Sequence, residues 1–234
     1  MPTLSLENQV SLVTGARRGI GEARALVFAE AGADVIICDW VTKTGELDAV
    51  AEKIENFGRR ALAVHADVKK KADIEHLIKK TMDTFGRINI LVNKARVGDN
   101  GRSLEPEDFD LEASKVYAVE MMAKLVESAA IVHLDEEAWD EVFENNLKSC
   151  LLCSKAVPPI MMNQKKGNII NISSVRAFVR GTGAMTNYAI TKKAMLMLTE
   201  GLAADLARYN IRVNAIGPGG IKTEMMRHTF ANPV

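Results

Sequence analysis

Short β-rich runs alternate with amphipathic segments along this chain, and the alternation constrains its fold more than any other feature. Six runs have strand character, and the segments between them carry apolar residues at helical spacing. This pattern is typical of βαβ units, in which helices cover both faces of a parallel sheet. The six expected strands are "VSLVTG" (10–15), "DVIICD" (34–39), "ALAVHAD" (61–67), "INILVN" (88–93), "NIINISS" (168–174) and "IRVNAIGP" (211–218).

Three of the intervening segments are predicted to be helices that end near a glycine, which serves as a C-cap. They are "IGEARALVFAEAG" (20–32), "ELDAVAEKIENFG" (46–58) and "ADIEHLIKKTMDTFG" (72–86). A chain of 234 residues with 47% hydrophobic content can bury one sizeable core. We therefore predict an α/β fold, a doubly wound parallel sheet in three layers (α/β/α), formed by a single domain over residues 1–234.

One connection is much longer than the others. About 40 residues separate Asn93, at the end of the fourth expected strand, from Asp135. Connections longer than about 15 residues are normally functional, disordered or structured by themselves. We interpret residues 97–134 as an insertion, which is either a solvated segment without a chemical role, a substrate cap or a subunit contact.

Composition excludes several classes of partner. Thirty basic and thirty acidic side chains give a net charge of zero, which does not favour binding to nucleic acid or to an anionic membrane. No apolar run approaches the roughly 18 residues of a membrane span, and the N-terminus lacks signal-peptide character, so a cytoplasmic protein is expected. The three cysteines, Cys38, Cys150 and Cys153, are predicted to be reduced core thiols, and no metal site is expected.

A glycine-rich turn follows the first expected strand and precedes a helix. Gly15, Gly19 and Gly21 would let backbone N–H groups approach a pyrophosphate at the helix N-terminus. The second strand ends at Asp39, where a carboxylate can accept hydrogen bonds from the adenosine ribose hydroxyls. Together these features predict a dinucleotide site in a Rossmann fold.

Several motifs, in order along the chain, resemble those of the classical short-chain dehydrogenases/reductases. The glycine turn "TGARRGIG" is similar to the family's TGxxxGIG motif, and "NAIGPGGIKT" is similar to its PGxxxT stretch around the nicotinamide. "HADV", "NNLKS" and "NIINISS" match further family segments, and "YAITK" matches the Tyr-xxx-Lys pair. The resemblance covers nearly the whole chain apart from residues 97–134.

The resemblance implies an oxidoreductase that transfers a hydride between NAD(P) and a secondary alcohol or ketone. In this family pattern Tyr188 is the general acid/base, Ser174 binds the substrate oxygen and Asn146 holds a water that relays protons. Residues at i and i+4 share a helix face, so Lys192, unlike Lys193, would share the cleft with Tyr188 and stabilise its phenolate. The resemblance implies that Lys192 also holds the nicotinamide ribose.

The cofactor is expected to be NAD, with NADP as the second possibility. Asp39 would repel a 2′-phosphate, whereas Arg17 and Arg18 lie where NADP-preferring relatives often place a basic residue. The two arginines could, however, simply face solvent or the pyrophosphate. The residues that the resemblance assigns to cofactor binding are Gly15, Arg17, Arg18, Gly19, Ile20, Gly21, Asp39, Asp67, Val68, Asn93, Tyr188, Lys192, Pro218, Gly219, Ile221 and Thr223.

Three features depart from the family pattern. Relatives have NNAG after the fourth strand, whereas this chain reads "NKAR", with Arg96 in place of the glycine. The insertion follows, and the sequence stops soon after the sixth strand, at a shortened C-terminus. Two hypotheses remain: an active enzyme, expected to be a homodimer or homotetramer, or a non-catalytic subunit of the same fold with impaired cofactor or substrate binding.

Overall fold

A computed structural model of the protein describes residues 5–41, 44–94, 132, 134–179 and 186–223. Six parallel strands form one sheet, in the order β3-β2-β1-β4-β5-β6. The chain starts at the centre of the sheet, moves outward to β3 and returns to β4 beside β1. The strands are β1 (Val10–Thr14), β2 (Asp34–Asp39), β3 (Ala61–His65), β4 (Ile90–Asn93), β5 (Gly167–Ile172) and β6 (Ile211–Ile216).

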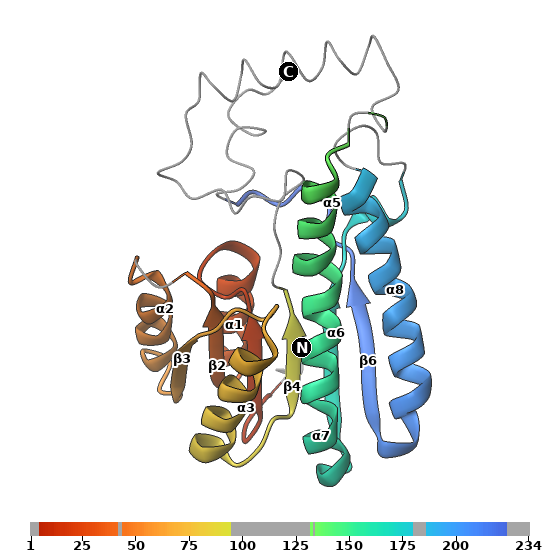
Figure 1. The fold of residues 1–234 in the computed structure, drawn as a ribbon. Helices are drawn as coiled ribbons and strands as arrows, with labels where there is room; N and C mark the ends of the chain where they lie inside the picture. The colour runs from red at the N-terminus through yellow and green to blue at the C-terminus, as the bar shows by residue number, and fades with distance from the viewer. Residues whose placement is uncertain (1–4, 42–43, 95–131, 133, 180–185, 224–234) are drawn as a thin grey trace.

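Helices connect the strands and cover both faces of the sheet (Figure 1). The doubly wound α/β fold predicted from the sequence is therefore confirmed. The helical elements are α1 (Gly19–Glu30), α2 (Glu46–Glu55), α3 (Lys71–Phe85), α5 (Glu136–Phe143), η3 (Glu144–Lys148), α6 (Ser149–Ala156), α7 (Pro158–Gln164), η4 (Val175–Ala177), α8 (Thr186–Leu206) and η6 (Ala207–Tyr209).

The expected glycine at the end of the third predicted helix is a C-cap. Gly86 has a left-handed conformation with φ 70°, and its N–H donates to the carbonyl of Met82 at 2.9 Å. A side chain would be strained at this φ, whereas glycine has no Cβ and adopts it freely. The chain can therefore turn at once from α3 towards β4.

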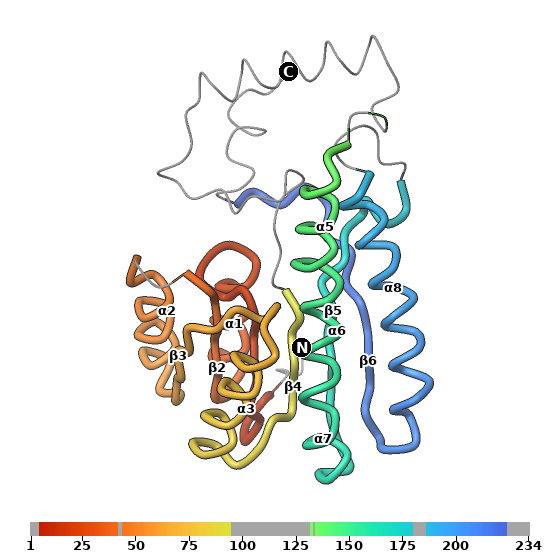
Figure 2. The backbone as a smooth tube through the Cα atoms, in the orientation of Figure 1, coloured from red at the N-terminus to blue at the C-terminus, as the bar shows by residue number. Residues whose placement is uncertain are grey.

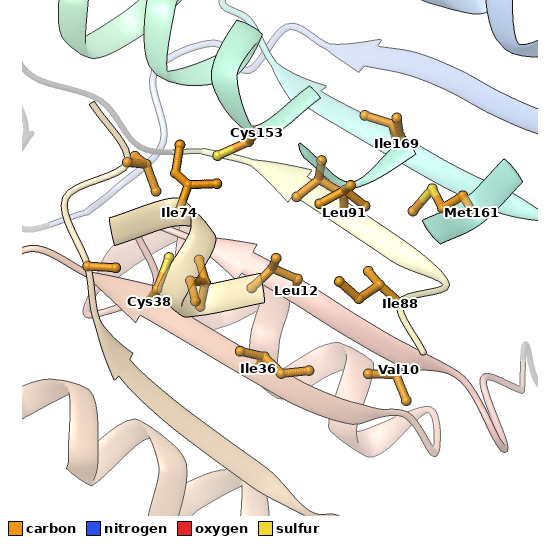
Figure 3. Close-up of a cluster of buried hydrophobic side chains, with 14 of the residues drawn as sticks. Val10, Leu12, Ile36, Cys38, Ile74, Ile88, Leu91, Cys153, Met161 and Ile169 are labelled. Carbon is orange, nitrogen blue, oxygen red and sulfur yellow. The ribbon is translucent and has the colours of Figure 1, made fainter. Parts of the chain in front are cut away.

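Alternate residues of the strands enter two separate hydrophobic cores. Leu12, Ile36 and Leu91 pack with α3, α6 and α7, together with Cys153 and Met161, in the cluster drawn in Figure 3. The strand neighbours of the first three point to the opposite face. These neighbours, Val13, Ile37 and Val92, pack with apolar residues of α1 and α2. Both faces of the central strands are thus buried, which explains why the strand segments read as continuous apolar runs.

α5, η3 and α6 follow one another as one long helix beside β4 and β5 (Figure 2). At η3 this helix widens into a π-helical turn, which is rare and frequently marks a functional site. The helical periodicity of the sequence does not distinguish this turn from an ordinary α-helix. Among the residues that the structure describes, no helix is long and apolar enough to cross a membrane.

Most of the segment that we interpret as an insertion, together with Arg96 and the residues after Thr223, lies outside the described residues. The structure therefore does not test the predictions made for them.

The three cysteines provide a test of the core. All are buried and free, and burial raises their thiol pKa, for Cys150 to about 11. At pH 8 about one Cys150 thiol in a thousand is then ionised, and thiolate is the reactive form. We expect the native protein to react with a disulfide reagent only slowly, and all three thiols to react at once in denaturant. Rapid labelling of one or more thiols in the native protein would contradict this packing.

Candidate active site

The candidate site is built where the strands β1, β4 and β5 end. The chain order of the sheet reverses between β1 and β4, and ligands of open α/β sheets bind outside the carboxyl ends of the strands at such a point. Thr14, the last residue of β1, joins the two strands there. Its hydroxyl lies 3.3 Å from the Val92 carbonyl and accepts a hydrogen bond from the Lys94 N–H at 3.0 Å.

The turn after β1 has the shape of a phosphate cradle. Gly15 and Gly19 adopt positive φ values of 62° and 60°. At Gly21 an added Cβ would lie 2.1 Å from the Gly15 carbonyl oxygen, so only glycine fits. α1 starts at Gly19, and the N–H groups of a first helical turn lack intrahelical acceptors. These residues therefore fit a dinucleotide, whose pyrophosphate would accept hydrogen bonds from them.

The end of the PGxxxT stretch lies beside this glycine turn. A Cβ added to Gly19 would approach Thr223 at 3.5 Å, so the structure brings Thr223 to the glycine turn. Pro218 is half-buried, and its carbonyl accepts a hydrogen bond from the Val175 N–H at 3.0 Å. Gly219 and Ile221 are exposed.

The Arg17 side chain does not face solvent, which was one of the placements that the sequence left open for it. Its side chain is only 4% exposed; the Nε atom lies 3.7 Å from Asp39 Oδ1, and Nη1 donates to the Glu46 carboxylate. The two carboxylates attract the guanidinium into the space between β2 and α2. Arg18 and Ile20, by contrast, are partly exposed.

Asp39 and Asp67 differ in what their carboxylates contact. Asp39 lies at the end of β2, where its carboxylate accepts a hydrogen bond from the Val41 N–H at 3.3 Å. The Asp67 carboxylate accepts from the Lys69 N–H at 3.1 Å and so shapes the turn after β3. Val68 is buried in the core on the α3 side of the sheet. In this structure Asp67 and Val68 therefore also contribute to the fold itself.

Tyr188 and Lys192 lie one turn apart at the start of α8 and are almost fully buried, with 3% and 1% of their surface exposed. Lys192 Nζ lies 5.7 Å from the centre of the Tyr188 ring and donates to the Ile172 carbonyl at 2.9 Å. The neighbouring Lys193 is exposed and lies over the ring of Phe178. The i, i+4 spacing thus correctly separated the lysine beside Tyr188 from its neighbour.

Ser174 lies two residues after the end of β5. Its Oγ accepts a hydrogen bond from the Arg176 N–H at 3.2 Å, and this bond caps the short helix η4. A hydroxyl can accept and donate at the same time, so the Ser174 proton can still be donated to a ligand oxygen. α8 packs against η4, which brings this serine and Tyr188 to the same end of the sheet.

Asn146 lies in the π-helical turn η3 and is fully buried. Its Nδ2 donates to the Thr191 hydroxyl at 3.3 Å, and that hydroxyl donates to the Tyr188 carbonyl at 2.7 Å. Thr191 therefore links Asn146 to the Tyr188 segment, although the sequence analysis did not single it out. The available signal was a hydroxyl residue directly before the lysine of "YAITK".

Asn93 was predicted to contact the cofactor, but its side chain takes part in a buried network. Its Nδ2 donates to Asn171 Oδ1 at 2.8 Å and to Ser154 Oγ at 3.1 Å. Asn171 in turn donates to Thr199 Oγ1 at 2.9 Å. The signal that the sequence analysis missed is the placement of these polar residues inside otherwise apolar segments, where a buried polar group needs a partner.

Comparison with known proteins assigns the family. A family model described as short chain dehydrogenase matches residues 9–233. The chain belongs to this family. A 3-oxoacyl-(acyl-carrier-protein) reductase from Synechocystis sp. is 34% identical over 230 residues, which cover 98% of the chain and 81% of the reductase. A hydroxy(phenyl)methylsuccinyl-CoA dehydrogenase subunit from Thauera aromatica is 35% identical over 95% of the chain and 77% of its own length.

A solved short-chain dehydrogenase has the same architecture. The structure of a 7α-hydroxysteroid dehydrogenase in complex with NADH and 7-oxoglycochenodeoxycholic acid is 28% identical to the chain, with a TM-score of 0.76. The match covers 97% of this chain and 76% of that structure. The protein is thus an oxidoreductase of the short-chain dehydrogenase family, whose members use NAD(P)(H). Among the described residues, no group of three or more His, Cys, Asp or Glu is placed to hold a metal ion.

The contact between Thr191 and Asn146 predicts a stability effect. Thr191→Val keeps the shape of the side chain but removes the acceptor of a buried Asn146 N–H, which costs about 1–3 kcal/mol when no other partner replaces it. We expect urea denaturation to show a loss of this size, and Thr191→Ser, which keeps the hydroxyl, to lose much less. Equal stability of the valine variant and the parent would show that this hydrogen bond does not hold Asn146.

Proposed function

We propose that the protein is an NAD-preferring oxidoreductase that interconverts a secondary alcohol and its ketone, with Tyr188 as general acid/base. One observation carries the proposal. Tyr188 and Lys192 share one face of α8, are both buried, and lie near the end of β5, at the same end of the sheet as Ser174. A tyrosine placed beside a buried cation is suited to proton transfer, because the cation stabilises the phenolate.

The bound nicotinamide would accept the hydride in oxidation and supply it in reduction. In oxidation, Tyr188 takes the hydroxyl proton of the alcohol as the C–H bond breaks. In reduction, it returns that proton to the oxygen of the former ketone. The protein side chains thus move the proton, and no charge is left on the substrate oxygen.

Three residues support this step. Ser174 donates its hydroxyl proton to the substrate oxygen and stabilises the negative charge that develops there. Lys192 Nζ lies 2.9 Å from the Ile172 carbonyl, and this contact fixes its ammonium near Tyr188, from where it would also hold the nicotinamide ribose. Asn146, at the widened turn η3, holds a water that carries protons towards solvent.

NAD is the proposed cofactor. The Asp39 carboxylate ends β2, where it can accept hydrogen bonds from the ribose hydroxyls and would repel a 2′-phosphate. The similar hydroxysteroid dehydrogenase was solved with NADH, which supports this choice. The glycine turn, Arg18 and the stretch from Pro218 to Thr223 would bind the remaining parts of the dinucleotide.

The proposed substrate class is a ketone or secondary alcohol, and ketones that carry a thioester group are the first compounds to assay. Two similar relatives are named for thioester substrates, a 3-oxoacyl group on acyl carrier protein and a succinyl-CoA derivative. The third similar protein is named for a cyclic secondary alcohol of a steroid. A panel with a 3-oxoacyl-CoA and with cyclic and linear alcohols therefore covers the chemistry of all three.

The experiment measures turnover of this panel with NAD(H) and NADP(H), for the parent and for Tyr188→Phe. Loss of the general acid/base is expected to lower kcat by about 10²–10⁴-fold. Tyr209→Phe, which removes a phenol hydroxyl near the start of β6, serves as the matched control and should leave kcat unchanged. Equal turnover by Tyr188→Phe would refute the assigned role. An absence of binding to both NADH and NADPH would favour a non-catalytic subunit.

We also propose a homodimer formed through the long helix from α5 to α6 together with α8. Leu151 on α6, and Ile190 and Met197 on α8, are large apolar side chains that are exposed in the single chain. Leu151→Glu combined with Met197→Glu would place charges in this contact. We expect light scattering to show a monomer, whereas Val27→Glu on α1 should leave the size unchanged. A dimer that survives both substitutions would exclude this surface.

A further inference from the structure

We propose that Glu46 is a second determinant of dinucleotide choice, because it holds Arg17 against Asp39 and so keeps the guanidinium from receiving a 2′-phosphate. The inference rests on the proposed dinucleotide site. It assigns to Glu46, on α2, a positioning role that acts through Arg17. Glu46 does not itself need to contact the dinucleotide.

The contacts show how Arg17 is held. Its Nη1 donates to Glu46 Oε2, and its Nε lies 3.7 Å from Asp39 Oδ1. The same oxygen of Glu46 accepts a second hydrogen bond from the Thr44 hydroxyl at 2.9 Å. The Thr44 hydroxyl therefore helps to fix the carboxylate oxygen that binds Arg17.

The charge of Glu46 is maintained in this position. Burial raises its pKa, but hydrogen bonds from Arg17 and Thr44 and the charges of Arg17 and Arg18 outweigh that effect and lower it below the ordinary value. The carboxylate is thus ionised at neutral pH. Arg17 is only 4% exposed, so its guanidinium has few solvent contacts to exchange for those with the two carboxylates.

Arg17 would otherwise be a suitable receptor for a phosphate. A guanidinium matches the geometry of a phosphate with two parallel hydrogen bonds. Arg17 lies beside Asp39, the proposed partner of the ribose hydroxyls, so a 2′-phosphate on that ribose would lie near the Arg17 guanidinium. To bind that phosphate, Arg17 must leave Glu46, and the Arg17–Glu46 ion pair is then lost. Glu46 therefore disfavours NADP by retaining Arg17.

Removal of the Glu46 charge tests the proposal. We expect Glu46→Gln to tighten NADPH binding about fivefold, the scale of a partly exposed ion pair, and to change NADH binding by less than about twofold. Trp40, next to Asp39 and half exposed, provides a fluorescence signal for titrations with both dinucleotides. A general loss of structure would weaken the binding of both dinucleotides, so a gain in NADPH affinity cannot come from damage to the fold.

Three further measurements make the test specific. Calorimetric titrations with 2′,5′-ADP and 5′-AMP, which lack the nicotinamide, should show the same selective gain for the 2′-phosphate. Glu46→Ala should repeat the result. Asp48→Asn removes a charge from an exposed residue in the same helical turn and should leave the NADPH to NADH ratio of Kd values unchanged.

A double-mutant cycle with Arg17→Ser decides whether Glu46 acts through Arg17. The gain from Glu46→Gln should disappear when Arg17 is serine. An unchanged ratio in Glu46→Gln, or a gain that persists without Arg17, would overturn the inference while NADH binding by the parent leaves the proposed function intact. If the parent binds neither dinucleotide, the proposed function fails and this inference fails with it.

Discussion

The hydrogen bond between the side chains of Asn93 and Asn171 joins the carboxyl ends of β4 and β5 inside the protein, and the candidate site depends on it. Through Ser154 the network reaches α6, and through Thr199 it reaches α8. α6 continues the helix that contains Asn146, and α8 carries Tyr188 and Lys192. Buried polar networks of this kind orient their elements because an unpaired group would be costly. The network therefore positions the proposed catalytic residues before any ligand binds.

The architecture could be predicted because each level of the sequence agrees with the others. The strands read as continuous apolar runs since Leu12 and Val13, or Leu91 and Val92, enter opposite cores. Gly86 ends its helix as expected, and the i, i+4 spacing distinguished Lys192 from Lys193. These are local rules, and local rules can be read from one sequence.

The remaining features depend on contacts that only the folded chain defines. Asn93 faces Asn171 because β4 and β5 pair in one register, which no periodicity reveals. The widened turn at Asn146 has the same residue pattern as an ordinary helix. The sequence left the placement of Arg17 open, and its partner Glu46 is 29 positions later in the chain. Such pairings between distant residues decide the details of the site without leaving a local pattern.

The contact of Arg17 with Glu46 also links two properties that are usually treated as independent. It connects the turn after β1 to the first turn of α2, so it contributes to the docking of that helix as well as to the proposed ribose site. An evolutionary change of cofactor through these residues would therefore alter the local stability of α2 in the same step. Proteins that change cofactor by this route would need a second substitution between β2 and α2 that restores the stability of α2. This requirement limits the number of substitution pathways.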